Sequence, residues 1–196
     1  MQLFFAPTSP FARKVRIVAH ELGVAERIAM IAVDPWTDAG LRAVNPLAKV
    51  PTLVRDDGSA LYDSGAICDF LDDMAGGGLI PRSGEPRWRA LRLQALSADA
   101  CAAAGRLFAG QRRGGVDPMA GRFTAAIYAS LDVLEDERLA PANPDLGDIC
   151  AALLPAYLSF RWPGHRWRDG RPRLAAFLAA IERRPAFAAT AHALPD

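Results

Sequence analysis

Short apolar runs alternate with segments of helical periodicity in the first part of the chain. Runs that are rich in apolar and β-branched residues predict strands at residues 2–6, 27–33, 50–54 and 60–62. Apolar residues spaced by three or four predict helices at residues 10–22, 39–44 and 65–74. Gly23 suits the end of the first helix, and Asp57-Gly58 between the last two strands indicates a hairpin. The order β-α-β-α-β-β-α is the layout of a small sheet with helices packed on it.

Glycine and proline residues from Gly76 to Pro86 mark a linker, beyond which the pattern changes. Apolar positions such as Phe123, Ile127 and Leu131 then recur every three or four residues, with no strand-like alternation. The helices predicted for this part lie at residues 87–109, 118–139, 146–160 and 173–181, with a last short one after Pro185. The expected fold class is therefore an α+β domain at residues 1–76, a linker at 77–86 and an all-α helical bundle domain at 87–196.

The charge balance excludes some partners. The chain has 23 basic and 22 acidic residues and a net charge of +1, so we expect no long-range attraction to nucleic acid or anionic lipid. Arginine clusters at 112–113 and 161–173 lack regularly spaced aromatic residues, and we interpret them as solvated faces or small-anion contacts. No run reaches membrane-spanning length and the N-terminus shows no secretory signal, so a cytoplasmic protein is expected.

The cysteine pattern argues against metal and disulfide chemistry. Cys68, Cys101 and Cys150 are far apart and odd in number, with no CxxC pair and no histidine at metal-ligand spacing. We expect buried free thiols in a reducing compartment, and no metal site.

Ser9 is the first candidate for chemistry. It directly precedes Pro10, and serine before proline is a normal helix start. The positive end of a helix also favours an anion, so the Ser9 hydroxyl could donate a hydrogen bond to the sulfur of a bound thiolate. The alternatives are that Ser9 only caps the helix, or that Thr8 donates instead.

Two further stretches could hold a ligand. The bond between Val50 and Pro51 enters a predicted strand; if it is cis, the Val50 N–H and C=O can pair with an extended peptide, and the alternative is an ordinary trans turn. At Asp63-Ser64, the carboxylate can pair with an ammonium, while the hydroxyl and the helix N-terminus can donate to a carboxylate. Here the alternative is a simple helix cap.

In these stretches the sequence resembles the bacterial cytosolic glutathione transferase family. The matching blocks are Ser9-Pro10-Phe11-x-Arg13-Lys14-Val15, Asn45-Pro46-Leu47-x-Lys49-Val50-Pro51-x-Leu53, Asp63-Ser64-x-x-Ile67 and Asp148-Ile149. The resemblance covers essentially all 196 residues. It implies a thioredoxin-like first domain that binds glutathione, a second, electrophilic substrate between the two domains, and a homodimer.

The resemblance also implies roles for individual residues. Ser9 would be the catalytic residue, hydrogen-bonded to the glutathione sulfur, and the lack of Cys in residues 8–10 argues against mixed-disulfide chemistry. The glutathione-binding residues would be Lys49 near the glycyl carboxylate, Val50 and a cis Pro51 beside the cysteinyl part, and Asp63 and Ser64 at the γ-glutamyl end. The implied activity is attack of the glutathione thiolate on an electrophilic small molecule without a metal.

The chain departs from the family pattern at several positions. Phe5 stands where some classes have tyrosine, and Ala48 stands where the family usually has glycine, which leaves the backbone path before Lys49 open. The usual Ser/Thr-x-x-Asp capping box is replaced by Asp145-Leu146-Gly147-Asp148. We expect Asp145 to cap the helix and Asp148 to stabilise the fold rather than to touch substrate.

The electrophile pocket has the weakest sequence signal. Candidate residues are Pro10 and Phe11 in the first domain and Phe108, Arg112, Arg113, Tyr157 and Phe160 in the second. Apolar walls with one or two arginines would suit an aromatic or anionic electrophile, although aromatic residues at helical spacing are more often core residues. Two other functions stay open: a non-catalytic binding or scaffold protein, and a glutathione-dependent isomerase, dehalogenase or peroxidase, which would use the same thiolate.

Overall fold

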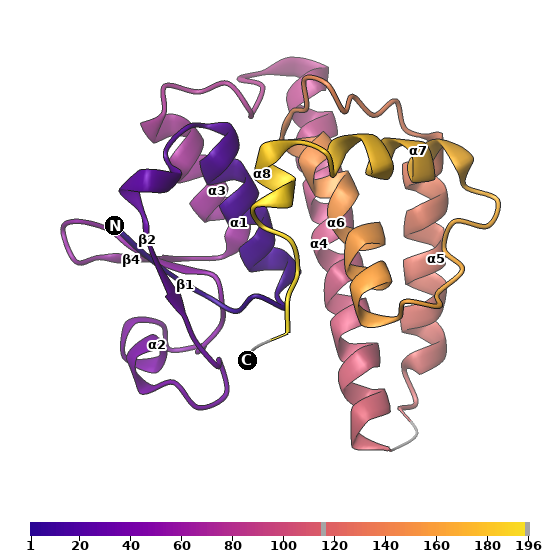
Figure 1. The fold of residues 1–196 in the computed structure, drawn as a ribbon, viewed down its shortest axis with the longest axis horizontal. Helices are drawn as coiled ribbons and strands as arrows, with labels where there is room; N and C mark the ends of the chain where they lie inside the picture. Colours follow the sequence, from indigo (N-terminus) through magenta and orange to yellow (C-terminus); the bar gives the residue numbers. More distant parts are fainter. Residues whose placement is uncertain (115–116, 195–196) are drawn as a thin grey trace. The chain divides into compact units, whose positions relative to one another are not determined.

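The structure is a computed structural model that describes residues 1–114 and 117–194. The chain divides into two compact units (Figure 1). One contains Met1–Ile80 and the segment from Pro185 onward, and the other is Pro81–Arg184. An α+β unit and a helical unit were predicted, and this fold class is confirmed.

The first unit is built on a four-stranded sheet with the order β2-β1-β3-β4. The strands are β1 (Gln2–Phe5), β2 (Ala29–Ala32), β3 (Thr52–Val54) and β4 (Ala60–Tyr62). Strand β1 pairs in parallel with β2 and antiparallel with β3, and β3 pairs antiparallel with β4 across the predicted hairpin. Leu3 and Leu53 are partners in the register of the two central strands, and both are fully buried in the core.

Helices pack on this sheet in the predicted order. They are α1 (Pro10–Glu21), the 3₁₀ turn η1 (Ala25–Arg27), α2 (Ala39–Val44) and α3 (Ser64–Met74). Helices α1 and α3 lie side by side (Figure 1) and bury Val15, Ile67 and Leu71. The strand predicted at 27–33 is shorter than expected, because the Ile28 N–H closes the preceding turn on the Ala25 carbonyl.

The segment from Pro185 onward differs from the prediction. We expected it to belong to the helical domain, but it groups with the first unit, where α8 (Pro185–Ala188) packs on α1. Phe187 is almost fully buried, and its carbonyl accepts a hydrogen bond from Arg13 of α1 at 3.4 Å. Further along, the Ala193 N–H donates to the Pro7 carbonyl at 3.4 Å, two residues before Ser9. The C-terminal segment thus helps to hold the junction between β1 and α1.

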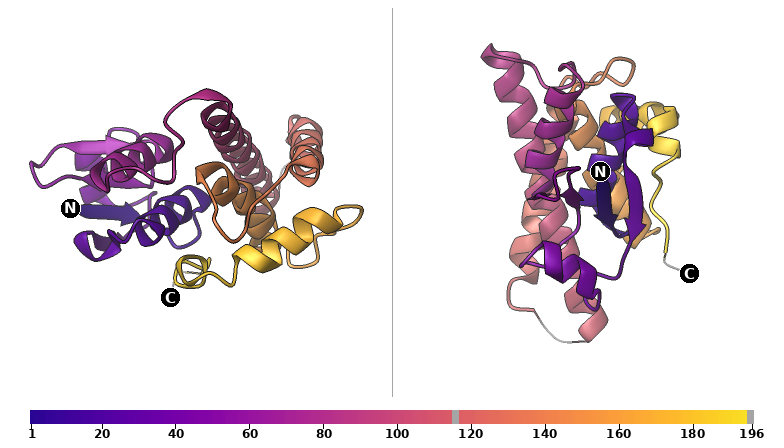
Figure 2. Two further views of the ribbon diagram at one scale, coloured as in Figure 1. Left: turned by 90° about the horizontal axis from the view of Figure 1, so that it is seen from above. Right: turned by 90° about the vertical axis from the view of Figure 1, so that its left-hand side faces the viewer.

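The second unit is helical. Its helices are α4 (Gly84–Arg113), α5 (Ala120–Asp136), α6 (Leu146–Arg161) and α7 (Pro172–Ile181). Helices α5 and α6 both lie against α4 (Figure 2), and their apolar faces bury Leu93, Ile127 and Leu154. Helix α4 is longer than the predicted 87–109; it ends at Gly114, whose φ of 70° is the left-handed conformation of a glycine cap.

Two interpretations based on composition have different outcomes. Cys68, Cys101 and Cys150 are buried and unbridged, as predicted. The view of 161–173 as a solvated arginine cluster is wrong for Arg171, which is buried and donates to Asp132 Oδ1 from Nε at 2.8 Å. Within the described residues, no helix is both long enough and apolar enough to cross a membrane.

Candidate glutathione site

Ser9 lies at the junction between β1 and α1. Its backbone is extended (φ −85°, ψ 122°), and its Oγ accepts a hydrogen bond from the Ala12 N–H at 3.2 Å, with Pro10 in the first turn of the helix. A hydroxyl has one hydrogen to donate and two lone pairs to accept with. Capping therefore occupies one lone pair of Ser9 and leaves its hydrogen, for which the described part of the chain provides no acceptor. Capping and donation to a ligand are compatible at this position.

The Val50–Pro51 peptide bond is cis. The first paired residue of β3 is Thr52, so Val50 lies immediately before the strand ladder. Ala48, two residues earlier, has a φ of 47°. This is the left-handed region that glycine adopts without strain, so the chain keeps a glycine-like turn with an alanine in it.

Asn45 holds this loop in place. Its buried side-chain amide donates to the Lys49 carbonyl at 3.2 Å and to Thr52 Oγ1 at 2.9 Å, and its Oδ1 accepts from the Leu47 N–H at 2.9 Å. The sequence indicated Asn45 only as the first residue of the block that continues to Val50-Pro51, with no role of its own. A buried amide that bonds three points of one loop positions that loop.

Asp63 and Ser64 begin α3. Asp63 has a φ of 74°, which is strained for a residue with a side chain, and its Oδ1 accepts from the N–H groups of Gly65 at 2.7 Å and Ala66 at 3.2 Å. Asp63 therefore occupies these two N–H groups as a helix cap, which was the alternative to their donation to a ligand carboxylate. The buried Ser64 side chain and the second carboxylate oxygen of Asp63 stay as the polar groups for a ligand.

A pocket of about 250 Å³ in the first unit brings these residues together. Its lining residues are Phe11, Asn45, Leu47, Lys49, Val50, Pro51, Tyr62, Asp63 and Ser64. All five predicted glutathione-binding residues and one predicted electrophile-pocket residue are among them. Ser9 and Pro10 do not line this pocket, although Phe11 follows them in the first turn of α1. Leu47 and Tyr62 were not predicted; they are 63% and 45% exposed, unusual for large apolar side chains.

The candidates of the second unit separate into two groups. Phe108, Tyr157 and Phe160 surround the guanidinium of Arg161, whose Cζ lies 4.4, 5.3 and 4.9 Å from the three ring centroids. Arg161 Nε also donates to the Tyr157 hydroxyl at 3.2 Å. Burial raises the pKa of the Tyr157 phenol above its ordinary value, although Arg161 opposes the shift, so the phenol stays protonated at neutral pH.

The arginines that we named as candidates for the electrophile pocket, Arg112 and Arg113, stay predictions. Both are exposed at the end of α4, whereas the contact with the Phe108 ring is made by Arg161. The arginine that gathers the aromatic candidates is Arg161, four residues after Tyr157, and this i, i+4 spacing was the signal that could have indicated it.

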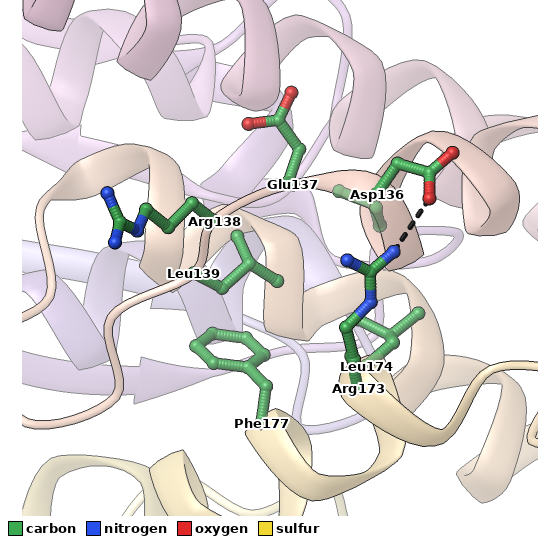
Figure 3. Close-up of a pocket in the computed structure, with 8 residues that line it drawn as sticks. Asp136, Glu137, Arg138, Leu139, Arg173, Leu174 and Phe177 are labelled. Carbon is green, nitrogen blue, oxygen red and sulfur yellow. Dashed lines mark hydrogen bonds and ion pairs between the residues drawn. The ribbon is translucent and has the colours of Figure 1, made fainter.

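The second unit contains a pocket of its own, of about 440 Å³ (Figure 3). It is lined by Leu134, Asp136, Glu137, Arg138, Leu139, Arg173, Leu174 and Phe177. No sequence motif indicated it.

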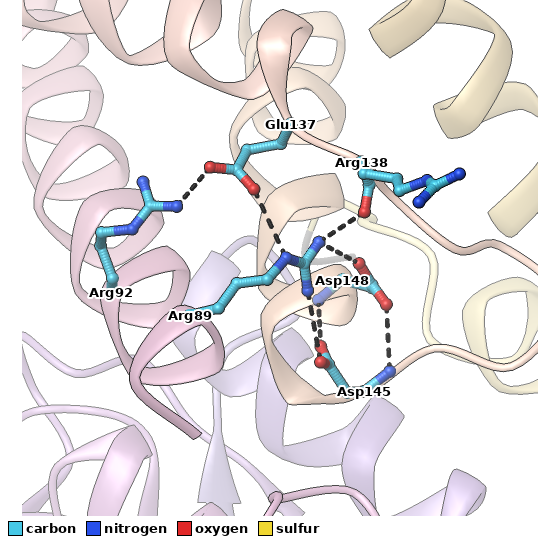
Figure 4. Close-up of polar contacts among 6 residues, drawn as sticks. All are labelled: Arg89, Arg92, Glu137, Arg138, Asp145 and Asp148. Carbon is cyan, nitrogen blue, oxygen red and sulfur yellow. Dashed lines mark hydrogen bonds and ion pairs between the residues drawn. The ribbon is translucent and has the colours of Figure 1, made fainter. Parts of the chain in front are cut away.

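Near this pocket, the start of α6 is stabilised by the predicted cap. Asp145 Oδ1 accepts from the Asp148 N–H at 2.9 Å and Asp148 Oδ2 accepts from the Asp145 N–H at 3.2 Å, a reciprocal capping box. Arg89 of α4 donates to both carboxylates, at 3.3 and 3.0 Å, and Figure 4 shows it between them and Glu137. Burial raises the pKa of the Asp148 carboxyl above its ordinary value, although Arg89 opposes the shift. These contacts belong to folding, as we expected for Asp148.

Comparisons with known proteins identify the family. Residues 8–74 match the model of the glutathione S-transferase N-terminal domain. The chain is 31% identical to an uncharacterized GST-like protein of Escherichia coli K12, YibF, over 97% of this chain and 98% of the relative. The chain belongs to the glutathione S-transferase family. The family resemblance inferred from the sequence motifs is therefore confirmed.

Solved structures of glutathione transferases resemble the chain over its length. A glutathione transferase family member from Pseudomonas fluorescens Pf-5 with bound glutathione is 37% identical, covers 98% of this chain and 99% of its own, and superposes with a TM-score of 0.90. A structure of a family member from the same strain holds S-(propanoic acid)-glutathione; it is 36% identical, with 99% and 100% coverage and a TM-score of 0.87. These similarities confirm the glutathione transferase fold. The roles of individual site residues stay predictions.

Proposed function

We propose that this glutathione S-transferase family member binds glutathione in the 250 Å³ pocket and transfers it, as the thiolate, to an electrophilic small molecule. The observation that carries the proposal is the meeting of Lys49, Val50, Pro51, Asp63 and Ser64 in one pocket. These residues come from two loops that are separated in the sequence, and each suits a different part of the tripeptide. The glutathione bound to the similar Pseudomonas protein supports the same ligand here.

The polar groups of the pocket match the ends of glutathione. The second oxygen of Asp63 can accept from the γ-glutamyl ammonium, and the Ser64 hydroxyl can donate to the neighbouring carboxylate. The Val50 backbone, ahead of the β3 ladder, can pair with the cysteinyl part as another strand would. Lys49 is exposed at the pocket and carries a charge suited to the glycyl carboxylate.

Ser9 supplies the activation in this proposal. A thiol with a pKa of ~8.5 is mostly protonated at neutral pH, and a hydrogen-bond donor beside a helix N-terminus stabilises its thiolate. The thiol proton leaves to solvent, the sulfur electron pair forms a bond to the electrophilic carbon, and the leaving group departs with its own electron pair. The Ser9 hydrogen that no described residue accepts is the one available to the sulfur.

Three further features are part of the proposal. The residues that we propose for contact with the electrophile are Phe11, which lines the glutathione pocket, and, within the second unit, Phe108 and Tyr157 beside Arg161. The S-(propanoic acid)-glutathione in the similar Pseudomonas structure supports a small organic group on the sulfur of the product. We also propose that the protein is a cytoplasmic homodimer. Light scattering of the purified protein can test whether it is a dimer.

The Ser9→Ala variant tests the assignment of the activating residue. With 1-chloro-2,4-dinitrobenzene as electrophile, we expect kcat to fall at least about tenfold with little change in the glutathione KM, because the lost hydrogen bond acts on the thiolate. The loss should shrink as pH rises, since a thiol with a higher pKa ionises without help.

Two control variants accompany Ser9→Ala. Ser83→Ala removes an exposed serine that begins α4 without a side-chain capping bond, and it should leave the kinetics unchanged. Thr8→Val tests the rival donor and should retain most of the activity. Wild-type kcat in Ser9→Ala would disprove the role of Ser9. Retention on immobilised glutathione with no turnover of any electrophile would favour a binding protein instead.

A further inference from the structure

The pocket of the helical unit is a candidate ligand site that lies outside the proposed glutathione site. It has a volume of about 440 Å³, within the range of ~300–1,000 Å³ that is typical of small-molecule sites. It lies between the end of α5, the residues that follow α5, and the first turns of α7 (Figure 3).

Charged contacts hold the walls of this pocket. The Arg138 carbonyl accepts from Arg89 of α4 at 2.7 Å, and Arg184 donates to the Ala142 carbonyl at 2.6 Å, so the segment after α5 is fixed at two points. Across the pocket, Glu135 accepts from the N–H groups of Arg173 at 3.1 Å and Leu174 at 2.7 Å, which joins α7 to α5. The pocket is therefore largely preformed.

The interior of the pocket is apolar. Leu134, Leu174 and Phe177 are buried side chains of the core, and Leu139 is half-buried beside them. In Figure 3, Leu139 and the Phe177 ring lie between the Arg138 guanidinium on one side and the Arg173–Asp136 pair on the other. A ligand with a flat apolar body can cover these side chains.

The charges at the rim are matched with one exception. Asp136 pairs with Arg173 at 2.7 Å, and Glu137 pairs with Arg89 at 3.4 Å and with Arg92. Arg138 also lines the pocket, but its guanidinium has no polar partner in the part of the chain that the structure describes. Figure 4 shows only the backbone carbonyl of Arg138 in the polar network, with its side chain directed away. The unmatched charge at this rim is positive.

We propose that this pocket binds a small aromatic carboxylate, with its ring on Leu139 and Phe177 and its carboxylate on Arg138. A planar guanidinium donates two parallel hydrogen bonds to a carboxylate, and an aromatic body suits both the apolar floor and the Phe177 ring. The site is independent of glutathione, because all of its residues belong to the helical unit and none belongs to the glutathione pocket.

Calorimetric titration with 2-naphthoate and 2-naphthamide tests the proposal, since the two probes have the same shape and differ in charge. We expect 2-naphthoate to bind at one site per chain and at least about tenfold more tightly than the amide, the scale of one charge-assisted pair. Saturating S-hexylglutathione should not displace it. Equal affinity for both probes, no saturable binding, or displacement by S-hexylglutathione would overturn the proposal.

Variants of Arg138 test whether the carboxylate of the ligand binds this side chain. Arg138→Gln should lower the affinity for 2-naphthoate to that of the amide, while Arg138→Lys, which keeps the charge but not the paired donors, should give an intermediate affinity. Because the Arg138 side chain is exposed and only its carbonyl bonds Arg89, the fold should tolerate both changes. The matched control is Arg122→Gln, which removes an exposed arginine of α5 outside the pocket and should have no effect. An unchanged affinity in Arg138→Gln would refute the assignment.

Discussion

Replacing Asn45 with alanine removes the buried amide that organises the loop of the glutathione pocket. The change deletes three hydrogen bonds, those to the Lys49 carbonyl, Thr52 Oγ1 and the Leu47 N–H. A typical hydrogen bond contributes ~0.5–1.5 kcal/mol to stability, so the loss amounts to about 3 kcal/mol. Thr52 Oγ1 still donates to the Lys49 carbonyl at 2.8 Å, so one end of the loop keeps a restraint.

The functional effect of Asn45→Ala should appear in glutathione binding. The loop carries Lys49, Val50 and Pro51, whereas Ser9 lies on a different element, the start of α1. We therefore expect the glutathione KM to rise about tenfold or more, with a smaller change in kcat, because binding groups move while the thiolate donor stays in place. Steady-state kinetics with glutathione varied will separate the two effects.

Urea denaturation measures the stability part of the same prediction. Thr52→Val is a milder variant that removes the two hydrogen bonds of one hydroxyl from this network, and it should lose about 2 kcal/mol. Asn143→Ala, at an exposed asparagine of the helical unit, is the control and should stay within about 0.5 kcal/mol of wild type. The reasoning fails if Asn45→Ala loses less than Thr52→Val, or if kcat falls while the glutathione KM stays constant.

Two further predictions concern the start of α6. In Gly147→Ala the new Cβ would lie 2.8 Å from the Ala90 Cα, so urea denaturation should show a loss of ~1–3 kcal/mol in the free energy of unfolding. The control Gly121→Ala has open space around the new Cβ and should gain up to ~1 kcal/mol. Equal stabilities of the two variants would contradict the clash. The folded-state pKa of Asp148 lies above its ordinary value of 3.8, so this group favours folding below that value and loses its contribution as pH rises through the folded-state pKa. Asp148→Asn lacks this titration. Relative to wild type, its free energy of unfolding should increase between pH 4 and pH 7, and a relative decrease in parallel denaturation curves would show that Arg89 outweighs burial.

Local patterns were sufficient for most of the secondary structure and for the caps. Apolar periodicity and turn residues indicated every helix and strand except η1, because these signals act over a few neighbouring residues. Ser9, Asp63 and Asp145 all cap helices as their positions suggested. A cap is a contact with an N–H two or three residues away, so the sequence contains both partners.

Predicting the glutathione pocket required both the sequence motifs and the tertiary structure. The motifs indicated Lys49, Val50, Pro51, Asp63 and Ser64 by residue type and order, and the β3–β4 pairing brings the two stretches to one pocket. The detail of the Asp63 carboxylate was not predictable, because a carboxylate at a helix start can bond either its own helix or a ligand. In the structure it bonds its own helix, through the N–H groups of Gly65 and Ala66.

By itself, the sequence determined the element types, the two-unit organisation and the family, since each depends on short-range periodicity or on ordered motifs. Tertiary structure alone decided which distant side chains meet. It placed the segment from Pro185 onward on α1, gave Asn45 its three partners, gathered the aromatic candidates around Arg161 and formed the pocket beside Arg138. Arg161 and Tyr157 have a helical spacing and the partners of Asn45 are close in sequence, but the contact of α8 with α1 and the pocket beside Arg138 join distant residues and exist only after the chain has packed.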